Sequence, residues 1–224
     1  MILLGMLIVG AIFLVVGWAV TTEMLQHRAW RRRVASGDTD IIGALIEEAL
    51  NTWRRARPPK GIHPGTWAGV QSAQLVAVEP DGATLSASAE GEFRTEGGRR
   101  VQVTSPLDEA IAIAARLLDM MLYDVPNLRL GTVRVDVYTT FSEPDGTLAQ
   151  RPILTVTADR AIAEDLAWDA LTPAEILGRF EAHYVRDPAG RAIPIEVPPI
   201  TGRPPRPAAE AAAEFTAQRE RPTE

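Results

Sequence analysis

The hydrophobic pattern of the chain is most pronounced at its start, where residues 2–20 are uncharged and mostly apolar. The first ionisable side chain is that of Glu23. A helix rises about 1.5 Å per residue, so this run spans roughly 28 Å, which matches the hydrocarbon core of a bilayer. In lipid the backbone must satisfy its own hydrogen bonds, and a helix does this. The pattern predicts a transmembrane anchor over residues 1–20.

Residues 21–36 form a basic segment that gives the predicted anchor a direction. Basic segments beside a membrane span stay in the cytoplasm, and tryptophans gather at the headgroup layer. The residues expected at the membrane surface are Trp18, Arg28, Trp30, Arg31, Arg32 and Arg33. We therefore expect a single-pass protein of the cell membrane, with the bilayer as a partner and the rest of the chain in the cytoplasm.

The sequence leaves two alternatives to this topology. A cleaved signal peptide has a basic segment before a shorter apolar core, whereas the basic cluster here follows a long one, so an uncleaved signal-anchor is favoured. An inverted topology would instead make the domain an extracytoplasmic sensor or envelope component.

Apolar residues recur at three- and four-residue intervals after the basic segment, for example at Ile42, Ile46 and Leu50. This period predicts an amphipathic helix over residues 39–55. Its apolar face either docks on the domain that follows or pairs with a second copy as a coiled coil. A loop rich in proline and glycine is expected over residues 57–65.

The period then changes to two, which is typical of strands. The predicted elements are a strand at 70–78, a strand at 85–93 and a short strand at 101–103. A Glu-Pro-Asp-Gly turn at 79–82 joins the first two. Together they predict an antiparallel meander. A helix over residues 105–123 follows, because Ser105 suits the N-cap and Pro106 suits the first helical position.

The same order of elements occurs again further along the chain. It comprises a strand at 130–141, a second Glu-Pro-Asp-Gly at 143–146, a strand at 153–158 and a helix that begins at the Thr172–Glu175 capping box. The stretches 70–122 and 130–182 are either two related ββα halves or a coincidence, since their flanking sequences do not match. A small hairpin is expected within residues 183–195.

These elements predict an α+β fold, in which a mainly antiparallel sheet packs against two or three helices. The predicted domain covers residues 37–195 and lies in the cytoplasm. From residue 196 the chain becomes rich in proline and alanine, a composition that supports neither a strand ladder nor a packed core. Residues 196–224 are therefore expected to form a disordered tail.

Composition and charge restrict the function further. The chain has no cysteine, which excludes disulfides, thiolate nucleophiles and cysteine-ligated metals. Lys60 is the only lysine among 23 basic residues, a bias that we attribute to a GC-rich bacterial genome. Residues 36–195 carry 23 acidic and 15 basic side chains, so the domain would be repelled by nucleic acid, and we expect no nucleic-acid partner.

Catalytic and nucleotide-binding motifs are not found in the sequence. The three histidines, His27, His63 and His183, lie in different predicted segments, so neither a metal site nor a cofactor is expected. The one constellation of polar residues follows the outward positions of two predicted strands. Its members are Arg134, Asp136, Tyr138, Thr140, Thr155, Thr157 and Asp159.

This candidate surface has three interpretations: a solvated sheet face, a face that binds a partner, or a catalytic site built on Asp136 and Asp159. The absence of catalytic motifs favours a cytoplasmic domain that binds an unidentified protein, or a second copy of itself, as an adaptor or assembly component. The alternative is a membrane-tethered enzyme, a hydrolase that uses the two aspartates.

Overall fold

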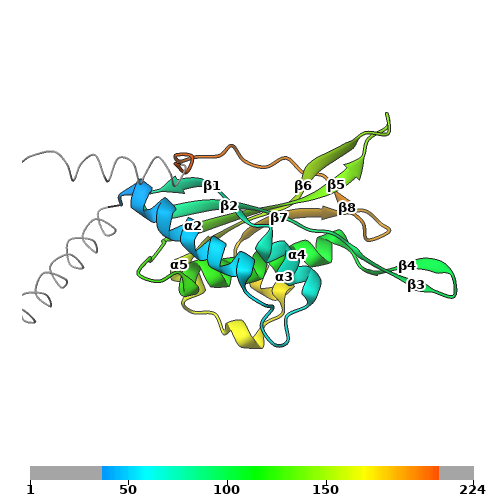
Figure 1. Cartoon of the computed structure of the whole chain (residues 1–224), viewed down its shortest axis with the longest axis horizontal. Helices are drawn as coiled ribbons and strands as arrows, with labels where there is room; N and C mark the ends of the chain where they lie inside the picture. Colours follow the sequence, from blue (N-terminus) through cyan, green and yellow to red (C-terminus); the bar gives the residue numbers. More distant parts are fainter. Residues whose placement is uncertain (1–36, 207–224) are drawn as a thin grey trace, which may run out of the picture. The chain divides into compact units, whose positions relative to one another are not determined.

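The computed structural model describes residues 37–206, except for the side chain of Arg100 (Figure 1). The predicted anchor, the end of the predicted tail and six candidate membrane-surface residues lie outside the described part: Trp18, Arg28, Trp30, Arg31, Arg32 and Arg33. No helix within residues 37–206 is long and apolar enough to cross a membrane.

The core of the domain is a six-stranded sheet with the order β1-β2-β5-β6-β7-β8. The strands are β1 (Gln74–Glu79), β2 (Gly82–Ser88), β5 (Thr132–Ser142), β6 (Leu148–Asp159), β7 (Glu181–Arg186) and β8 (Ala192–Ile193). Every neighbouring pair is antiparallel except β2 and β5, which are parallel. The predicted α+β class, with a mainly antiparallel sheet packed against helices, is confirmed.

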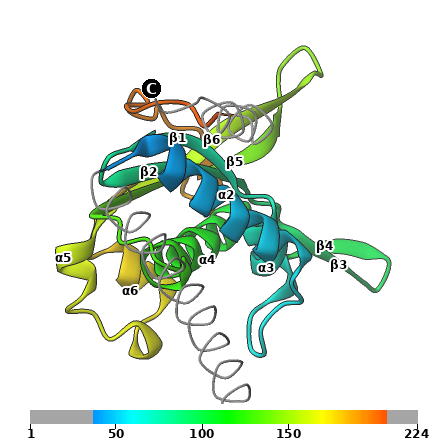
Figure 2. The same cartoon turned by 60° about the vertical axis from the view of Figure 1, so that its left-hand side comes forward.

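The helices cover one face of this sheet (Figures 1 and 2). They are α2 (Thr39–Arg55), α3 (Pro64–Gln71), α4 (Pro106–Asp119), a π-helical turn η1 (Met120–Asp124), α5 (Arg160–Ala163), a 3-10 turn η2 (Trp168–Ala170) and α6 (Pro173–Leu177). Helix α4 lies at the centre and contacts α3, α6, β5 and β6. It is buried on several sides, because apolar residues cover most of its circumference.

Helix α4 also explains the parallel strand pair. Parallel neighbours need a long crossover connection, and α4 supplies it between β2 and β5. Ser105 caps the helix by accepting a bond from the Asp108 N–H, and Pro106 occupies its first turn. The antiparallel meander expected within residues 70–103 is confirmed for β1 and β2 but wrong for the third strand, because β2 pairs with β5 instead. Periodicity does not reveal which strands become neighbours.

Strands β3 (Glu92–Glu96) and β4 (Arg99–Thr104) form a separate two-stranded sheet, which we call the arm. Its turn is Gly97–Gly98, and both glycines have the positive φ that a tight two-residue hairpin turn requires. Figures 1 and 2 show the arm extending away from the main sheet and its helices. The single strand predicted over residues 85–93 is thus divided between the main sheet and the arm.

The sheet face opposite the helices is crossed by residues 194–206, which we call the strap (Figure 1). The Ile195 N–H donates to the Pro152 carbonyl at 2.9 Å, and Val78 and Arg203 exchange two backbone hydrogen bonds of 2.8 and 2.9 Å. The predicted disordered tail is therefore ordered up to residue 206. Prolines prevent a regular ladder there, but tertiary contacts hold the segment without one.

Two further differences concern short elements. Residues 64–71 form helix α3, where the sequence predicted a loop and the start of a strand. The helix expected to reach residue 182 ends at Leu177, and strand β7 begins at Glu181. In both places the sequence stretch is too short for a period to be distinguished.

Candidate functional site

The predicted polar face is centred on Asp136, whose side chain the structure buries. The Arg134 guanidinium donates to both carboxylate oxygens at 2.9 Å, and the Thr155 hydroxyl donates to Oδ1 at 2.6 Å. The pair is bidentate, the geometry in which arginine binds carboxylates most strongly. Only 3% of the Asp136 side chain and 12% of the Arg134 side chain are exposed.

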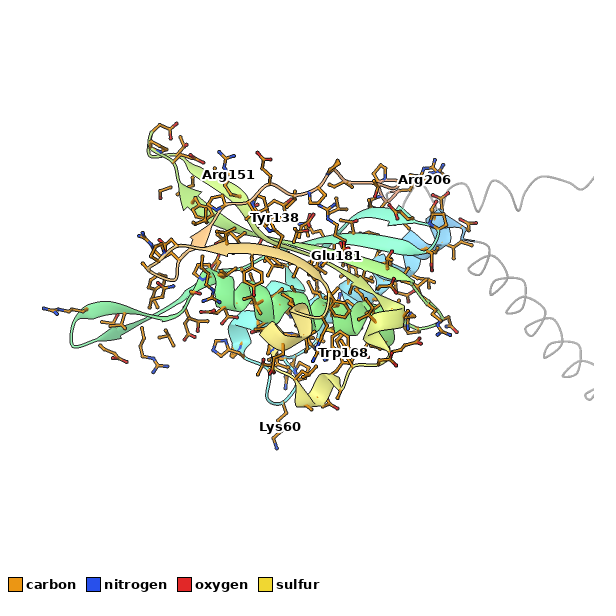
Figure 3. All side chains as sticks on the ribbon, turned by 180° about the vertical axis from the view of Figure 1, so that it is seen from behind. Lys60, Tyr138, Arg151, Trp168, Glu181 and Arg206 are labelled. Atoms are coloured by element: carbon orange, nitrogen blue, oxygen red, sulfur yellow. The ribbon has the colours of Figure 1, made fainter. Side chains whose placement is uncertain are left out.

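The strap closes this cluster from outside. Arg134 donates to the carbonyl of Pro198 at 2.8 Å and to that of Pro199 at 3.2 Å. Figure 3 shows Tyr138 on the strap side of the sheet and Trp168 on the helix side. The centre of the predicted surface is thus a packed internal network, because its donors and acceptors already have partners within the chain.

The remaining predicted residues lie around this network. Burial and the Asp136 carboxylate raise the pKa of the Tyr138 phenol, and Arg134 offsets part of the effect. Thr140 is exposed, and Thr157 is half-buried.

Asp159 does not join Asp136. It caps helix α5 by accepting a bond of 2.8 Å from the Ala161 N–H. It is opposite Thr132, four residues along β5 from Asp136, which corresponds to roughly 13 Å at the usual strand rise. The two carboxylates are thus held by different partners and do not form a pair.

A second polar cluster lies where α3, α4 and the arm meet. His63 Nδ1 is 3.2 Å from Glu109 Oε1, and His63 Nε2 is 3.2 Å from Glu92 Oε2. The Thr66 hydroxyl donates to the other Glu109 oxygen at 2.9 Å. Glu109 is only 4% exposed, whereas nearly half of the His63 side chain is exposed.

His63 Nδ1 has two neighbours, and each suits a different tautomer of the imidazole. The Gly65 N–H donates to Nδ1 at 3.3 Å, which requires Nδ1 without a proton. Donation from Nδ1 to Glu109 requires the proton. One neutral tautomer of the imidazole therefore accepts from the backbone through Nδ1, and the other donates to the carboxylate.

This cluster borders a cavity of about 460 Å³. The polar residues of its lining include His63, Ser72, Ser88, Glu90, Glu92 and Glu109. The acidic lining suits a cationic group, and His63 held by a buried carboxylate suits proton transfer. The Ser72 hydroxyl donates to the Gly69 carbonyl at 2.7 Å and accepts from the Ser88 N–H at 2.9 Å, so it has a structural role here.

The sequence did not predict this cluster, although it offers a signal at each of its two main residues. Glu109 is one of the few charged residues of the helix predicted over residues 105–123, and His63 precedes a proline. The sequence predicts a loop at this histidine, whereas it is the N-cap of α3 and its side chain lies against Glu109 of α4. A helix N-cap signal at His63-Pro64 could have indicated the short helix.

The described part of the chain holds no group of three or more acidic, histidine or cysteine side chains that could bind a metal ion. Comparisons with models of protein families, with curated proteins and with solved structures found no match to this chain.

Proposed function

We propose that this protein is a single-pass membrane protein whose cytoplasmic α+β domain binds another protein as an adaptor or assembly component. The apolar run and the arginines after it support the location. The observation that carries the binding role is the arm, because it exposes apolar side chains on an element that the rest of the domain does not cover.

The arm exposes Phe93 by 45%, Val101 by 42% and Val103 by 49%. A two-stranded ribbon is only marginally stable by itself, because it has no hydrophobic layer beneath it. Phe93 pairs with Gln102 and Val101 pairs with Arg94, so apolar side chains are exposed on both faces of the ribbon. Exposed apolar surface of this kind marks a site of interaction with another macromolecule. A partner that packs against the arm would bury these side chains and order the ribbon.

Affinity purification of the full chain in detergent, with the anchor intact, tests this proposal. We expect a stoichiometric protein partner. Exchange of Phe93 and Val101 for serine should reduce its recovery at least tenfold, because these substitutions remove apolar area without changing the turn. Leu148→Ser is a matched control, since Leu148 is 72% exposed at the tip of the β5–β6 hairpin.

Recovery of no partner, not even a second copy, would contradict the binding function. If the serine variant recovered as much partner as the wild type, the arm would not be the binding surface. Protease access in intact and permeabilised cells tests the cytoplasmic orientation separately: digestion of the domain in intact cells would show the inverted topology.

The alternative of a hydrolase using Asp136 and Asp159 gains no support from the geometry. Such a site needs two carboxylates that converge on one substrate. Here the first is held by Arg134 and Thr155 beneath the strap, and the second caps a helix.

A further inference from the structure

The end of the strap lies against the domain in the manner of a bound peptide. Its backbone forms a two-bond bridge to the edge strand β1 through Val78 and Arg203. Gly202 has a φ of +93°, and a Cβ there would lie 2.8 Å from the Val78 carbonyl oxygen. The glycine thus permits the close approach, and Pro204 and Pro205 then end the pairing because they have no N–H.

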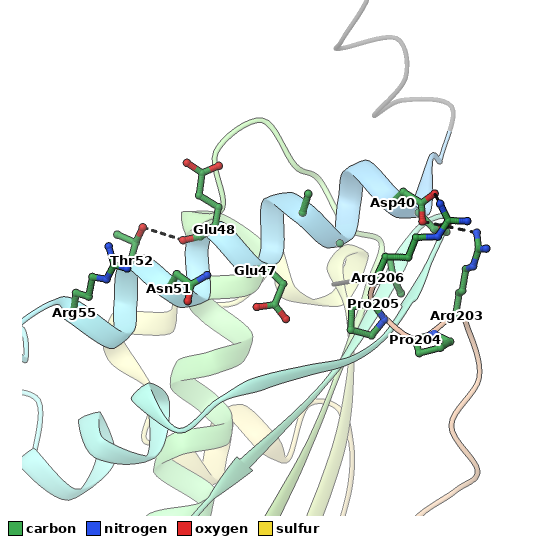
Figure 4. Close-up of a pocket in the computed structure, with 14 residues that line it drawn as sticks. Asp40, Glu47, Glu48, Asn51, Thr52, Arg55, Arg203, Pro204, Pro205 and Arg206 are labelled. Atoms are coloured by element: carbon green, nitrogen blue, oxygen red, sulfur yellow. Dashed lines mark hydrogen bonds and ion pairs between the residues drawn. The ribbon is translucent and has the colours of Figure 1, made fainter. Parts of the chain in front are cut away.

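Charge holds the same segment to helix α2. Arg203 Nη1 is 3.8 Å and Arg206 Nη1 is 3.3 Å from the Asp40 carboxylate. Figure 4 shows both guanidinium groups turned toward Asp40 across the two prolines. The strap therefore presents a rigid Pro-Pro unit flanked by two arginines to an acidic helix end.

The strap does not fill its groove. A cleft of about 380 Å³ remains between α2 and the end of the strap, and Glu47, Glu48 and Asn51 are part of its lining (Figure 4). Within residues 37–206, neither Glu47 nor Glu48 has an ion-pair partner. The groove thus contains two acidic side chains of α2 that the strap does not pair with.

We propose that the groove between α2 and β1 is a peptide-binding site for an extended segment of another protein that contains prolines and arginines, and that the strap is its resident occupant. The proposal rests on the proposed partner-binding function and names the chemistry of the partner segment. Recognition combines a backbone bridge to an edge strand, which supplies affinity, with charge pairing to α2, which supplies specificity.

The attachment of the strap determines what can replace it. A tethered segment has an effective concentration on the order of millimolar, so a free peptide with equal contacts displaces it poorly. A partner segment competes when it also places a basic side chain on Glu47 or Glu48. The cost of ordering such a segment is low, because proline-rich peptides are already extended in solution.

The test uses the full chain in detergent and a labelled peptide with the sequence of residues 197–206. In the Arg203→Glu and Arg206→Glu double variant, repulsion from Asp40 frees the groove. We expect this variant to bind the peptide at least tenfold more tightly than the wild type. Adding Asp40→Lys and Glu47→Lys should reverse that gain, and a peptide with glutamate in place of both arginines is the control.

Three outcomes would overturn the proposal. The first is a freed groove that does not bind the peptide while thermal unfolding shows that the variant remains folded. The second is equal binding of the control peptide. The third is a wild-type dimer that the double variant abolishes, since the occupant would then be the strap of a second copy. If the peptide does not bind the freed groove but a protein partner is still recovered through the arm, the groove proposal is wrong and the proposed function is unaffected.

Discussion

Asp136 and Glu109 are both buried carboxylates in one domain, and each has a threonine hydroxyl and a basic side chain as partners. Asp136 is held by Arg134 and Thr155, and the strap lies over them. Glu109 is held by His63 and Thr66 beside an open cavity. The two clusters contain the same kinds of side chain, and they differ in what surrounds them.

The difference shows when a buried charge serves only to hold the fold together. The Arg134 guanidinium also donates to two strap carbonyls, so the first cluster finds its partners inside the protein. In the second cluster, nearly half of the His63 side chain is exposed, and its imidazole lies between Glu109 and Glu92 at the edge of the cavity. A ligand has room to approach the second cluster and none to approach the first.

The largest effect should come from breaking the sealed cluster with Asp136→Ala. The substitution leaves the Arg134 guanidinium nearly buried without its carboxylate, which typically costs about 3–5 kcal/mol. For a domain of this size we expect the midpoint of thermal unfolding to fall by roughly 6–20 °C. Circular dichroism of the detergent-solubilised chain measures it.

Asp165→Ala is the control for this substitution, because Asp165 is exposed and forms no ion pair within the described residues. A loss with Asp136→Ala no greater than with the control would show that water reaches Arg134 and that the strap does not seal the cluster.

A smaller effect is expected from Glu109→Ala in the open cluster, about 1–3 kcal/mol. The Thr66 hydroxyl loses its acceptor, but the half-exposed His63 can turn to water. Glu109→Gln keeps an acceptor for Thr66 and should recover part of the loss. Urea denaturation of the wild type, Glu109→Ala and Glu109→Gln measures their free energies of unfolding. If Glu109→Ala lost as much stability as Asp136→Ala, the two clusters would not differ in the way described.

The smallest effect concerns Tyr138, beside the sealed cluster. Burial and the Asp136 carboxylate raise its pKa, so the folded state holds the phenolic proton more tightly than the unfolded state. Stability should therefore decline as pH rises from about 10 through the raised pKa. Absorbance titration should show one of the three tyrosines ionising late.

Tyr138→Phe should remove this late phase from the titration. Tyrosines that all ionise together near pH 10 would mean that the strap side of the sheet is open to solvent.

The sequence predicted elements well where their pattern is long or their capping chemistry is specific. Helix α2 has the predicted bounds, the N-cap at Ser105 and the capping box at Thr172 are present, and strand β5 differs from its prediction by two residues at one end and one at the other. Helix α3 was missed, because a stretch of eight residues does not establish a period. The small hairpin expected within residues 183–195 is present as β7 and β8, although β7 begins two residues earlier.

The candidate site was predicted less well, for a different reason. The strand pattern identified Arg134, Asp136 and Thr155 as neighbours on one face, and the structure brings them together. It could not show that a proline-rich segment some sixty residues later covers them, since no local pattern records that contact. The same limit hid the meeting of His63 with Glu109.

The sequence by itself determined the α+β class, because periodicity is a property of neighbouring residues. The anchor remains a prediction from hydrophobic length, since residues 1–36 lie outside the described part. Only the tertiary structure decided that β2 and β5 lie side by side, that the strap seals one buried carboxylate, and that a cavity opens beside the other. These outcomes depend on which distant segments meet. That choice follows from the packing of the whole domain around α4, where each buried polar group has to find its partner.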